Sequence, residues 1–325
     1  MSGTKKRKPF DLEHWDDVLK SPTPGYIVDD LIPESSTVVV LGRWKTGKTF
    51  LGLGAAFACV AGLPFLGRST RPGPVIYVHA EGTAQVRKRL LALSRFHGIE
   101  TNDGLYIVRR PVRLLDDEHD AHLRASIRSM PRKPTIIFFD TFARCILPAN
   151  ENDNCEVNGF VDRVEALRSD FGCSVVLVHH PGHGDSSQPR GASSILASAD
   201  AVLRLEPNGP EKDGRLDLVC GFLKDGEPFE PIGVRREVIH LGPDERGRQQ
   251  SSCVIVESDH APKGSTSLID RILDGVRENP RITTKDLAEF LGTTESNLRN
   301  KLPDLVREGK LIAEGDRPKQ YRRPE

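Results

Sequence analysis

Eight consecutive residues carry the most specific chemical pattern in this chain. Residues 42–49 read G-x-x-x-x-G-K-T. Glycine lets a backbone wrap closely around an anion, because it tolerates dihedral angles that a Cβ forbids. Successive amides and the start of a following helix then face the negative charge. We expect the whole segment to bind the phosphates of a nucleoside triphosphate, through Gly42, Arg43, Trp44, Lys45, Thr46, Gly47, Lys48 and Thr49.

Two residues of this segment have separate chemical roles. Lys48 would reach the β- and γ-phosphates, and the hydroxyl of Thr49 would bind Mg²⁺. The apolar run 37–41 precedes the segment and the run 50–56 follows it, so it lies between a predicted strand and a predicted helix. This context favours triphosphate binding over the alternative, a glycine-containing turn that binds no ligand.

Two carboxylates follow other apolar runs. Asp140 ends the run 134–139, and Glu81 follows the run 74–79. The carboxyl ends of parallel strands form the ligand crevice of such sheets, so both side chains would face the same ligand. Asp140 suits the binding of Mg²⁺ through water opposite Thr49. Glu81 suits activation of the water that attacks the γ-phosphate. The alternatives are a capping aspartate and a glutamate that merely favours a helix start.

A histidine ends a further apolar run. His179 follows residues 174–178, and a neutral imidazole there could hydrogen-bond the γ-phosphate and report hydrolysis to the adjacent loop. The alternative is a metal site made of His179, His180 and His183. Their spacing on a turn is poor for metal binding, and no acidic or cysteine partner adjoins them.

The same runs predict the fold. They are continuous rather than alternating in apolar character, which indicates strands buried on both faces, as in a parallel sheet covered by helices. From residue 215 to about residue 256, short alternating strands with glycine turns predict an antiparallel extension. We therefore expect an α/β fold with a mostly parallel central sheet.

Composition bounds the class of protein. The chain has 325 residues, with 46 lysines and arginines balanced by 46 aspartates and glutamates, so any basic surface must be local. No apolar run approaches the ~18–20 residues of a membrane span. The six cysteines are scattered without a C-x-x-C pattern, which fits a reducing compartment. We expect a cytoplasmic protein that does not bind membranes.

Four segments divide the chain. Residues 1–21 form a polar tail, 22–257 the phosphate-binding domain, 258–266 a linker containing proline and glycine, and 267–325 a small domain. The small domain reads helix, helix, turn, helix and hairpin. This order is typical of a winged helix-turn-helix domain.

The small domain also carries candidate DNA contacts. Its third predicted helix would enter a groove of duplex DNA, and its hairpin would form a basic wing. The candidates on these two elements are Arg299, Lys301, Lys310, Arg322 and Arg323. Nearby acidic residues dilute this basic face, so the alternative is a winged helix that binds protein. Pro303 should kink the third helix near its middle.

Taken together, these motifs resemble the RecA-like P-loop ATPases of the AAA_25 group, which includes RepA-type replicative helicases of plasmids and phages. The resemblance covers roughly residues 22–230. The matching segments are GRWKTGKT at 42–49, AEG with RKR at 80–89, FFDTFAR at 138–144, NEND at 150–153, VLVHH at 176–180 and RGASS with ADAVLRL at 190–205.

The resemblance implies a RecA-like core with ATP and Mg²⁺ as cofactors. It implies Glu81 as the general base, which would activate the attacking water, and His179 as the γ-phosphate sensor. It also implies assembly of identical chains into a ring, commonly a hexamer. Single-stranded DNA would pass through that ring, while the winged helix would bind duplex DNA.

Two positions differ from those relatives. Relatives often carry Lys-x-Arg on a late strand, inserted into the ATP site of the neighbouring subunit, whereas this chain has Lys224 followed by Asp225. Lys224 is a candidate catalytic residue, and the missing arginine leaves open whether it acts in trans. Many relatives also have a lysine after the paired histidines; here Arg190 would stabilise charge in its place or contact DNA.

Three functions are compatible with these residues. The first is a DNA-dependent ATPase of a phage, plasmid or integrated mobile element, acting as a replicative helicase or helicase-like motor. The second is an ATP-switched DNA-binding regulator or recombination mediator without unwinding activity. The third is a signalling ATPase whose small domain docks on protein.

Overall fold

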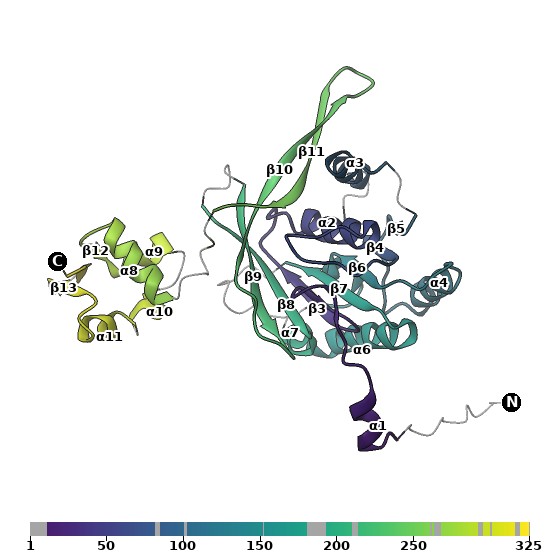
Figure 1. Cartoon of the computed structure of the whole chain (residues 1–325), viewed down its shortest axis with the longest axis horizontal. Coiled ribbons are helices and arrows are strands. Elements are labelled where there is room, and N and C mark those ends of the chain that lie inside the picture. The colour runs from purple at the N-terminus through teal and green to yellow at the C-terminus, as the bar shows by residue number, and fades with distance from the viewer. Residues whose placement is uncertain are drawn as a thin grey trace.

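The computed structural model describes residues 12–81, 85–100, 103–151, 153–180, 193–209, 214–260, 262, 268–291, 295–299, 301–315 and 319–324. Its larger unit is built on a nine-stranded sheet (Figure 1). The strands are β3 (Thr37–Leu41), β4 (Val75–His79), β5 (Leu105–Val108), β6 (Ile136–Asp140), β7 (Ser174–His179), β8 (Ala201–Pro207), β9 (Arg215–Leu223), β10 (Ile232–Pro243) and β11 (Gln249–Glu257). Their order across the sheet is β11-β10-β9-β8-β3-β7-β6-β4-β5.

The middle of this sheet is parallel. β8, β3, β7, β6, β4 and β5 run in one direction, so their carboxyl ends lie at one edge. Every residue of β3, β4 and β6 is buried, as the continuous apolar runs predicted. β8 to β11 pair antiparallel, and β10 has 12 residues, so this extension is longer than the short strands expected. The predicted α/β fold with a mostly parallel sheet is confirmed.

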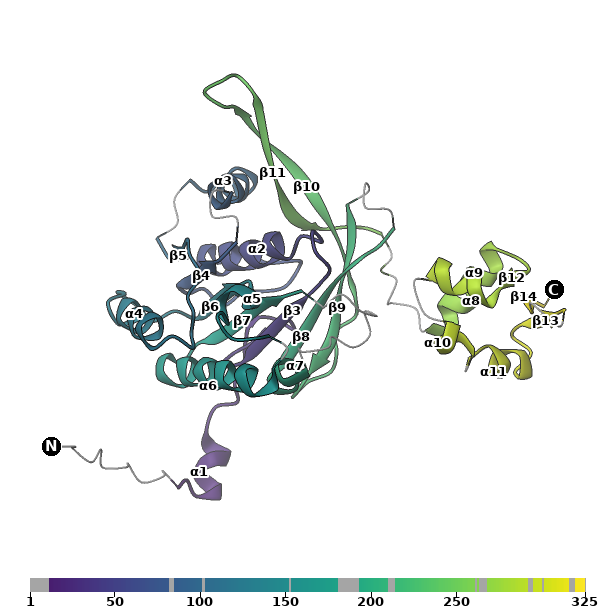
Figure 2. The same cartoon turned by 180° about the vertical axis from the view of Figure 1, so that it is seen from behind.

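Helices cover both faces of the sheet (Figures 1 and 2). One face carries α2 (Lys48–Ala61), α3 (Val86–His97) and a small hairpin of β1 (Tyr26–Val28) and β2 (Ile32–Pro33). The other carries α4 (Asp117–Arg128), α5 (Phe142–Cys145), α6 (Asn154–Phe171) and α7 (Ser193–Ser198). Alternate residues of β3 enter the two cores, with Val38 and Val40 in the first and Val39 and Leu41 in the second.

Asp200 fixes the amino end of the central strand. Its Oδ2 accepts hydrogen bonds from the Thr37 amide at 2.9 Å and from Arg168 Nη1 at 2.6 Å, and its Oδ1 accepts one from Lys224 Nζ at 3.3 Å. Thr37 is the first residue of β3. The cluster therefore lies at the end of this strand that is remote from residues 42–49.

The C-terminal unit has its own apolar core and a three-stranded sheet of order β12-β14-β13. Its elements are α8 (Leu268–Glu278), β12 (Ile282–Thr283), α9 (Thr284–Leu291), α10 (Glu295–Arg299), α11 (Leu302–Arg307), β13 (Ile312–Glu314) and β14 (Gln320–Arg322). The Thr283 hydroxyl accepts a hydrogen bond from the Asp286 amide at 3.2 Å, as expected for the N-cap of the following helix.

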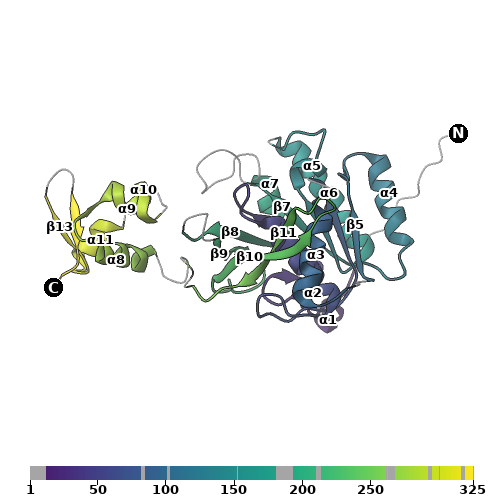
Figure 3. The ribbon, with the colours of Figure 1, turned by 90° about the horizontal axis from the view of Figure 1, so that it is seen from above.

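The third helix of this unit differs from the prediction. A kinked helix was expected, but α10 and α11 are two short helices, and Lys301 lies between them as the N-cap of α11 (Figure 3). Pro303 falls within the first turn of α11, where a missing N–H costs little. Arg299 and Lys301 therefore do not lie on one continuous helix.

One further helix, α1 (Trp15–Lys20), precedes the sheet and buries none of its residues. Within the described ranges, no helix is both long enough and apolar enough to cross a lipid bilayer.

Replacing Asp200 with alanine tests the importance of its cluster. We expect Asp200→Ala to lower the free energy of unfolding by about 1.5–3 kcal/mol, because it removes hydrogen bonds to a charged group at the start of the central strand. Urea denaturation measures this. The control is Glu165→Ala, since Glu165 also pairs with Arg168 but is 46% exposed and should cost under about 1 kcal/mol. Equal losses in both variants would contradict a special role for Asp200.

Candidate nucleotide-binding site

The phosphate loop joins β3 to α2 with backbone conformations that its sequence permits. Gly47 has φ +105°, in the left-handed region that favours glycine. At Gly42, a Cβ would lie 2.8 Å from the carbonyl oxygen of Leu205 and 2.8 Å from Thr46 Oγ1, so this position has no room for a side chain. The loop is closed internally by a hydrogen bond from Thr46 Oγ1 to the Arg43 carbonyl at 2.9 Å.

Lys48 lies inside this loop, with its side chain buried. Its ammonium group makes three hydrogen bonds, to the carbonyl oxygens of Gly42 at 2.6 Å and Arg43 at 2.9 Å, and to His180 Nδ1 at 2.9 Å. Burial lowers the pKa of Lys48 from 10.5 to about 8, although the negative charges of Asp140 and Glu81 act in the opposite direction. An incoming phosphate must replace the acceptors that now hold Lys48.

Asp140 ends β6 as a buried carboxylate, only 1% exposed. Its Oδ2 accepts a hydrogen bond from the Tyr77 hydroxyl at 2.8 Å, and among the described residues its Oδ1 has no hydrogen-bond donor. An oxygen with an open coordination position suits a hard, hydrated cation. Thr49, the second residue of α2, supplies a hydroxyl at the loop. Asp140 and Thr49 therefore fit the expected Mg²⁺.

Glu81 is held at the same edge of the sheet. The hydroxyl of Thr141 donates a hydrogen bond to Glu81 Oε1 at 2.9 Å, and Arg144 Nε lies 3.5 Å from the same oxygen. The Glu81 side chain is 42% exposed, so water can reach it. Parallel strands thus bring Lys48, Asp140 and Glu81 close enough to interact electrostatically, as expected from their positions at strand ends.

The two neighbouring histidines have different surroundings. His179 is buried, and its ring packs edge-on against Phe142, with centroids 5.2 Å apart. Its Nδ1 has no hydrogen-bond partner among the described residues, and burial lowers its pKa to about 4. His180, which is half-buried, contacts Lys48 instead, and burial also lowers its pKa. His180 therefore hydrogen-bonds Lys48 of the phosphate loop, and the positive charge of Lys48 also contributes to the lowered pKa of His179. The role of His179 as a γ-phosphate sensor stays a prediction, and His183 lies outside the described residues.

Another predicted residue, Lys224, is not part of this cluster. Lys224 pairs with Asp200 at the amino end of β3, whereas the phosphate loop follows the carboxyl end of that strand. Lys224 thus does not serve the site of its own chain, and its action on a neighbouring chain stays a prediction. Arg190 lies outside the described residues.

Several residues near the site were not predicted. Tyr77 is hidden within an apolar run, yet it donates to Asp140, and a Cβ at Gly52 of α2 would lie 2.9 Å from its hydroxyl oxygen. Arg144 stood within a matching motif but was given no role, and His180 was considered only as a ligand of the alternative metal site. The sequence offered one indication of their involvement: Arg144 lies four residues after Asp140, and His180 directly follows His179.

Comparison with known proteins agrees with this geometry. The family AAA_25, described as an AAA domain, matches residues 5–186, which is more than half of the chain. The chain belongs to this family. It is a RecA-like P-loop protein, and its family supports ATP binding and ATPase activity in general. No curated protein matches the chain.

The buried His179 generates a pH-dependence that can be measured. The unfolded chain protonates this histidine near pH 6.5, whereas the folded protein does so only near pH 4. Between these values the unfolded state binds more protons, so stability falls as the pH falls. We expect His179→Asn to reduce the loss of unfolding free energy between pH 7 and pH 4.5 by about 2–3 kcal/mol.

Urea denaturation at the two pH values measures that difference. His240→Asn is the matched control, because His240 is an exposed histidine on β10 and its replacement should leave the loss unchanged. The same acid-side loss in wild type and His179→Asn would contradict the assignment of His179 as a buried neutral group.

Proposed function

We propose that this protein is a DNA-dependent ATPase in which ATP hydrolysis drives action on DNA, as a RepA-type replicative helicase or helicase-like motor of a phage, plasmid or integrated mobile element. The observation that carries the proposal is that a single chain joins an ATP site of this family to a C-terminal unit with a basic pocket. An ATPase with its own nucleic-acid-binding unit can couple turnover to DNA.

In this proposal, hydrolysis uses residues from three strand ends. The loop amides and Lys48 hold the phosphates, and Glu81 accepts a proton from water as the water oxygen attacks the γ-phosphorus. The bond from the γ-phosphorus to the bridging oxygen breaks, which gives ADP and phosphate. Bound Mg²⁺, held by Thr49 and through water by Asp140, would offset the phosphate charge.

The C-terminal unit supports the DNA part of the proposal. Its elements run helix, strand, helix, two short helices and two strands, and β14 lies between β12 and β13. This order is typical of a winged helix, a class that often binds duplex DNA. Arg299 supports this role less than expected, because it pairs with Glu295 on its own helix at 3.0 Å.

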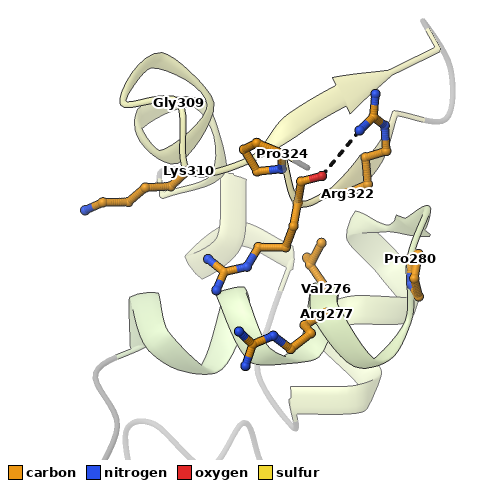
Figure 4. Close-up of a pocket in the computed structure, with 8 residues that line it drawn as sticks. Val276, Arg277, Pro280, Gly309, Lys310, Arg322 and Pro324 are labelled. Carbon is orange, nitrogen blue, oxygen red and sulfur yellow. Dashed lines mark hydrogen bonds between the residues drawn. The ribbon is translucent and has the colours of Figure 1, made fainter.

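A pocket on this unit gathers positive charge from separate elements. Figure 4 shows that Arg277 comes from α8, Arg322 from β14 and Lys310 from the turn before β13. We call it the C-terminal basic pocket; its lining residues are Val276, Arg277, Pro280, Gly309, Lys310, Arg322, Arg323 and Pro324. None of these lining residues is acidic, so the pocket suits a backbone phosphate of DNA.

Arg277 was not predicted, although it is well placed for such a contact. Lys310 pairs with Glu308 at 2.8 Å, and Arg322 is held by Glu314 at its Nε. Within the described part of the chain, the exposed Arg277 makes no ion pair.

The alternative function is an ATP-switched DNA-binding regulator or recombination mediator without unwinding activity. The position of Lys224 favours it, because this lysine is engaged by Asp200 and is followed by Asp225 rather than leading into an arginine. Slow hydrolysis would suit a switch. Strand unwinding with ATP, alongside footprinting for a preferred DNA sequence, separates the two functions.

Self-association is also part of the proposal. Large apolar side chains are exposed on α1 and just before it. The exposed fraction is 93% for Leu12, 71% for Trp15 and 65% for Leu19. Such a face on a short helix is typical of a contact surface rather than a solvated one. A homo-oligomer, with a hexameric ring as the expected form, is tested by native mass measurement with and without ATP.

The ATPase rate tests the central claim. We expect single-stranded DNA to raise the rate of ATP hydrolysis several-fold, because a motor releases products faster on its track. Lys48→Ala should abolish hydrolysis, since it removes the buried cation of the phosphate loop, and Glu81→Gln should keep ATP binding but lower turnover by at least about a hundredfold. An unchanged rate with every DNA tried would exclude a DNA-driven motor.

The C-terminal basic pocket makes a separate prediction. We expect Arg277→Ala to weaken duplex DNA binding and to reduce the slope of log K against log salt by about 1, because one phosphate contact is lost. Fluorescence anisotropy across a salt series measures both. The control is Arg128→Ala, an exposed arginine of α4 in the ATPase unit. Equal affinities and slopes for Arg277→Ala and wild type would remove the pocket from the DNA interface.

A further inference from the structure

We propose that Arg236, on β10, is a nucleotide-binding residue that reaches the phosphates of ATP from within the same chain. The proposal rests on the ATP site alone and does not require action on DNA. It concerns the antiparallel hairpin of β10 and β11, which the sequence analysis treated only as an extension of the sheet.

The hairpin lies against the phosphate loop. Arg236 Nη1 is 3.5 Å from the carbonyl oxygen of Lys45. A Cβ at Gly47 would lie 3.5 Å from Arg236 Cδ and 3.6 Å from Ile255 Cδ1. Arg236 and Ile255 are paired across the two strands, so the hairpin presents a cation and an apolar side chain side by side to the loop glycine.

The backbone that carries Arg236 is well anchored. The Arg236 amide donates a hydrogen bond to the Gly214 carbonyl at 3.1 Å, and β10 pairs with β9 on one side and β11 on the other. Farther along β10, Arg95 of α3 donates to the carbonyl of His240. The guanidinium thus reaches the phosphate loop from a strand whose backbone is hydrogen-bonded to several neighbouring elements.

The chemistry of the contact points to an anion. A guanidinium presents five N–H donors in a planar fork that matches phosphate oxygens, and bonds to charged oxygens are stronger than bonds to neutral ones. Here one of these donors faces a neutral carbonyl at a long 3.5 Å. Gly47 directly precedes α2, where the motif presents its amides to the phosphates. A bound triphosphate would bring charged oxygen acceptors within reach of the same guanidinium.

The need for a second cation follows from the rest of the site. Lys48 supplies one positive charge inside the loop, but its pKa is lowered to about 8, and Lys224 lies at the opposite end of β3. A triphosphate carries several negative charges. The guanidinium of Arg236 would supply a further positive charge at the loop.

The neighbouring residue provides a matched control. Side chains alternate along a strand, so Arg235 projects from the other face of β10, where it pairs with Glu237 at 2.7 Å. Arg235→Ala removes the same charge from the same strand without touching the loop. It distinguishes a specific contact of Arg236 from a general effect of positive charge on the hairpin.

Isothermal calorimetry with the full chain and Mg²⁺ tests the proposal, using ATP and inorganic tripolyphosphate as separate probes. We expect Arg236→Ala to weaken both by about ten- to a hundredfold, because a charge-assisted contact to phosphate is lost. Arg235→Ala should bind both as wild type does. Thermal unfolding without nucleotide checks that each variant is folded.

Three results would overturn the proposal: unchanged binding of both probes by Arg236→Ala, weaker binding of ATP with unchanged binding of tripolyphosphate, or equal losses in Arg235→Ala. The second would place Arg236 at the nucleoside instead. If Arg236→Ala does not fold, Arg236→Lys replaces it in the test. An ammonium lacks the planar fork of a guanidinium, so this variant should also bind both probes more weakly than wild type. A wild type that binds ATP without stimulation by DNA would refute the motor and leave this proposal intact.

Discussion

The buried carboxylate of Asp140 is the constraint on which the site depends. An ionised group in the protein interior is costly unless donors or cations surround it. Tyr77 supplies one donor and Lys48 a nearby positive charge, while the other carboxylate oxygen has no donor among the residues that the structure describes and suits a hydrated cation. Lys48 has the same difficulty with the opposite sign, so the two buried charges support each other. A bound nucleotide with its metal ion would balance both charges further, because the phosphates face Lys48 and the cation faces Asp140.

The parallel sheet is what makes this pairing possible. Lys48 follows β3, Asp140 ends β6 and Glu81 follows β4, residues that are far apart in sequence. Parallel pairing aligns the carboxyl ends of these strands, and burial on both faces fixes their register. The site is therefore a consequence of strand direction. The same argument explains why Lys224, on a strand end at the other edge, is absent from it.

Much of this could be predicted from the sequence because two strong patterns were present. Continuous apolar runs predicted the strands, and the carboxylates at their ends predicted the site, so the positions of Asp140 and Glu81 follow from the sequence. The phosphate loop was recognisable from glycine and lysine spacing alone. These signals are local, or they follow from one global rule about parallel strands.

What escaped prediction depends on side-chain direction and on pairs distant in sequence. Adjacent residues at a strand end diverge, and no pattern indicated that His180 would turn to Lys48 while His179 turned to Phe142. The Tyr77 hydroxyl was hidden in an apolar run. Arg236 is 188 positions beyond Lys48, and only the antiparallel return of β10 brings it to the loop. Pro303 was read as a kink, although a proline in the first turn of a helix permits a new start.

The length of the β10–β11 hairpin affects which arginine of β10 lies at the phosphate loop. Arg235 and Arg236 are chemically identical neighbours, and a slip of one residue between β10 and its partners would exchange them. The ladder with β11 pairs residues from Val234 to Pro243, and its irregularity between His240 and Gly242 breaks the repeat that a slipped alignment would need. The outer part of the hairpin can therefore fix the register of β10, which keeps Arg236 rather than Arg235 at the phosphate loop.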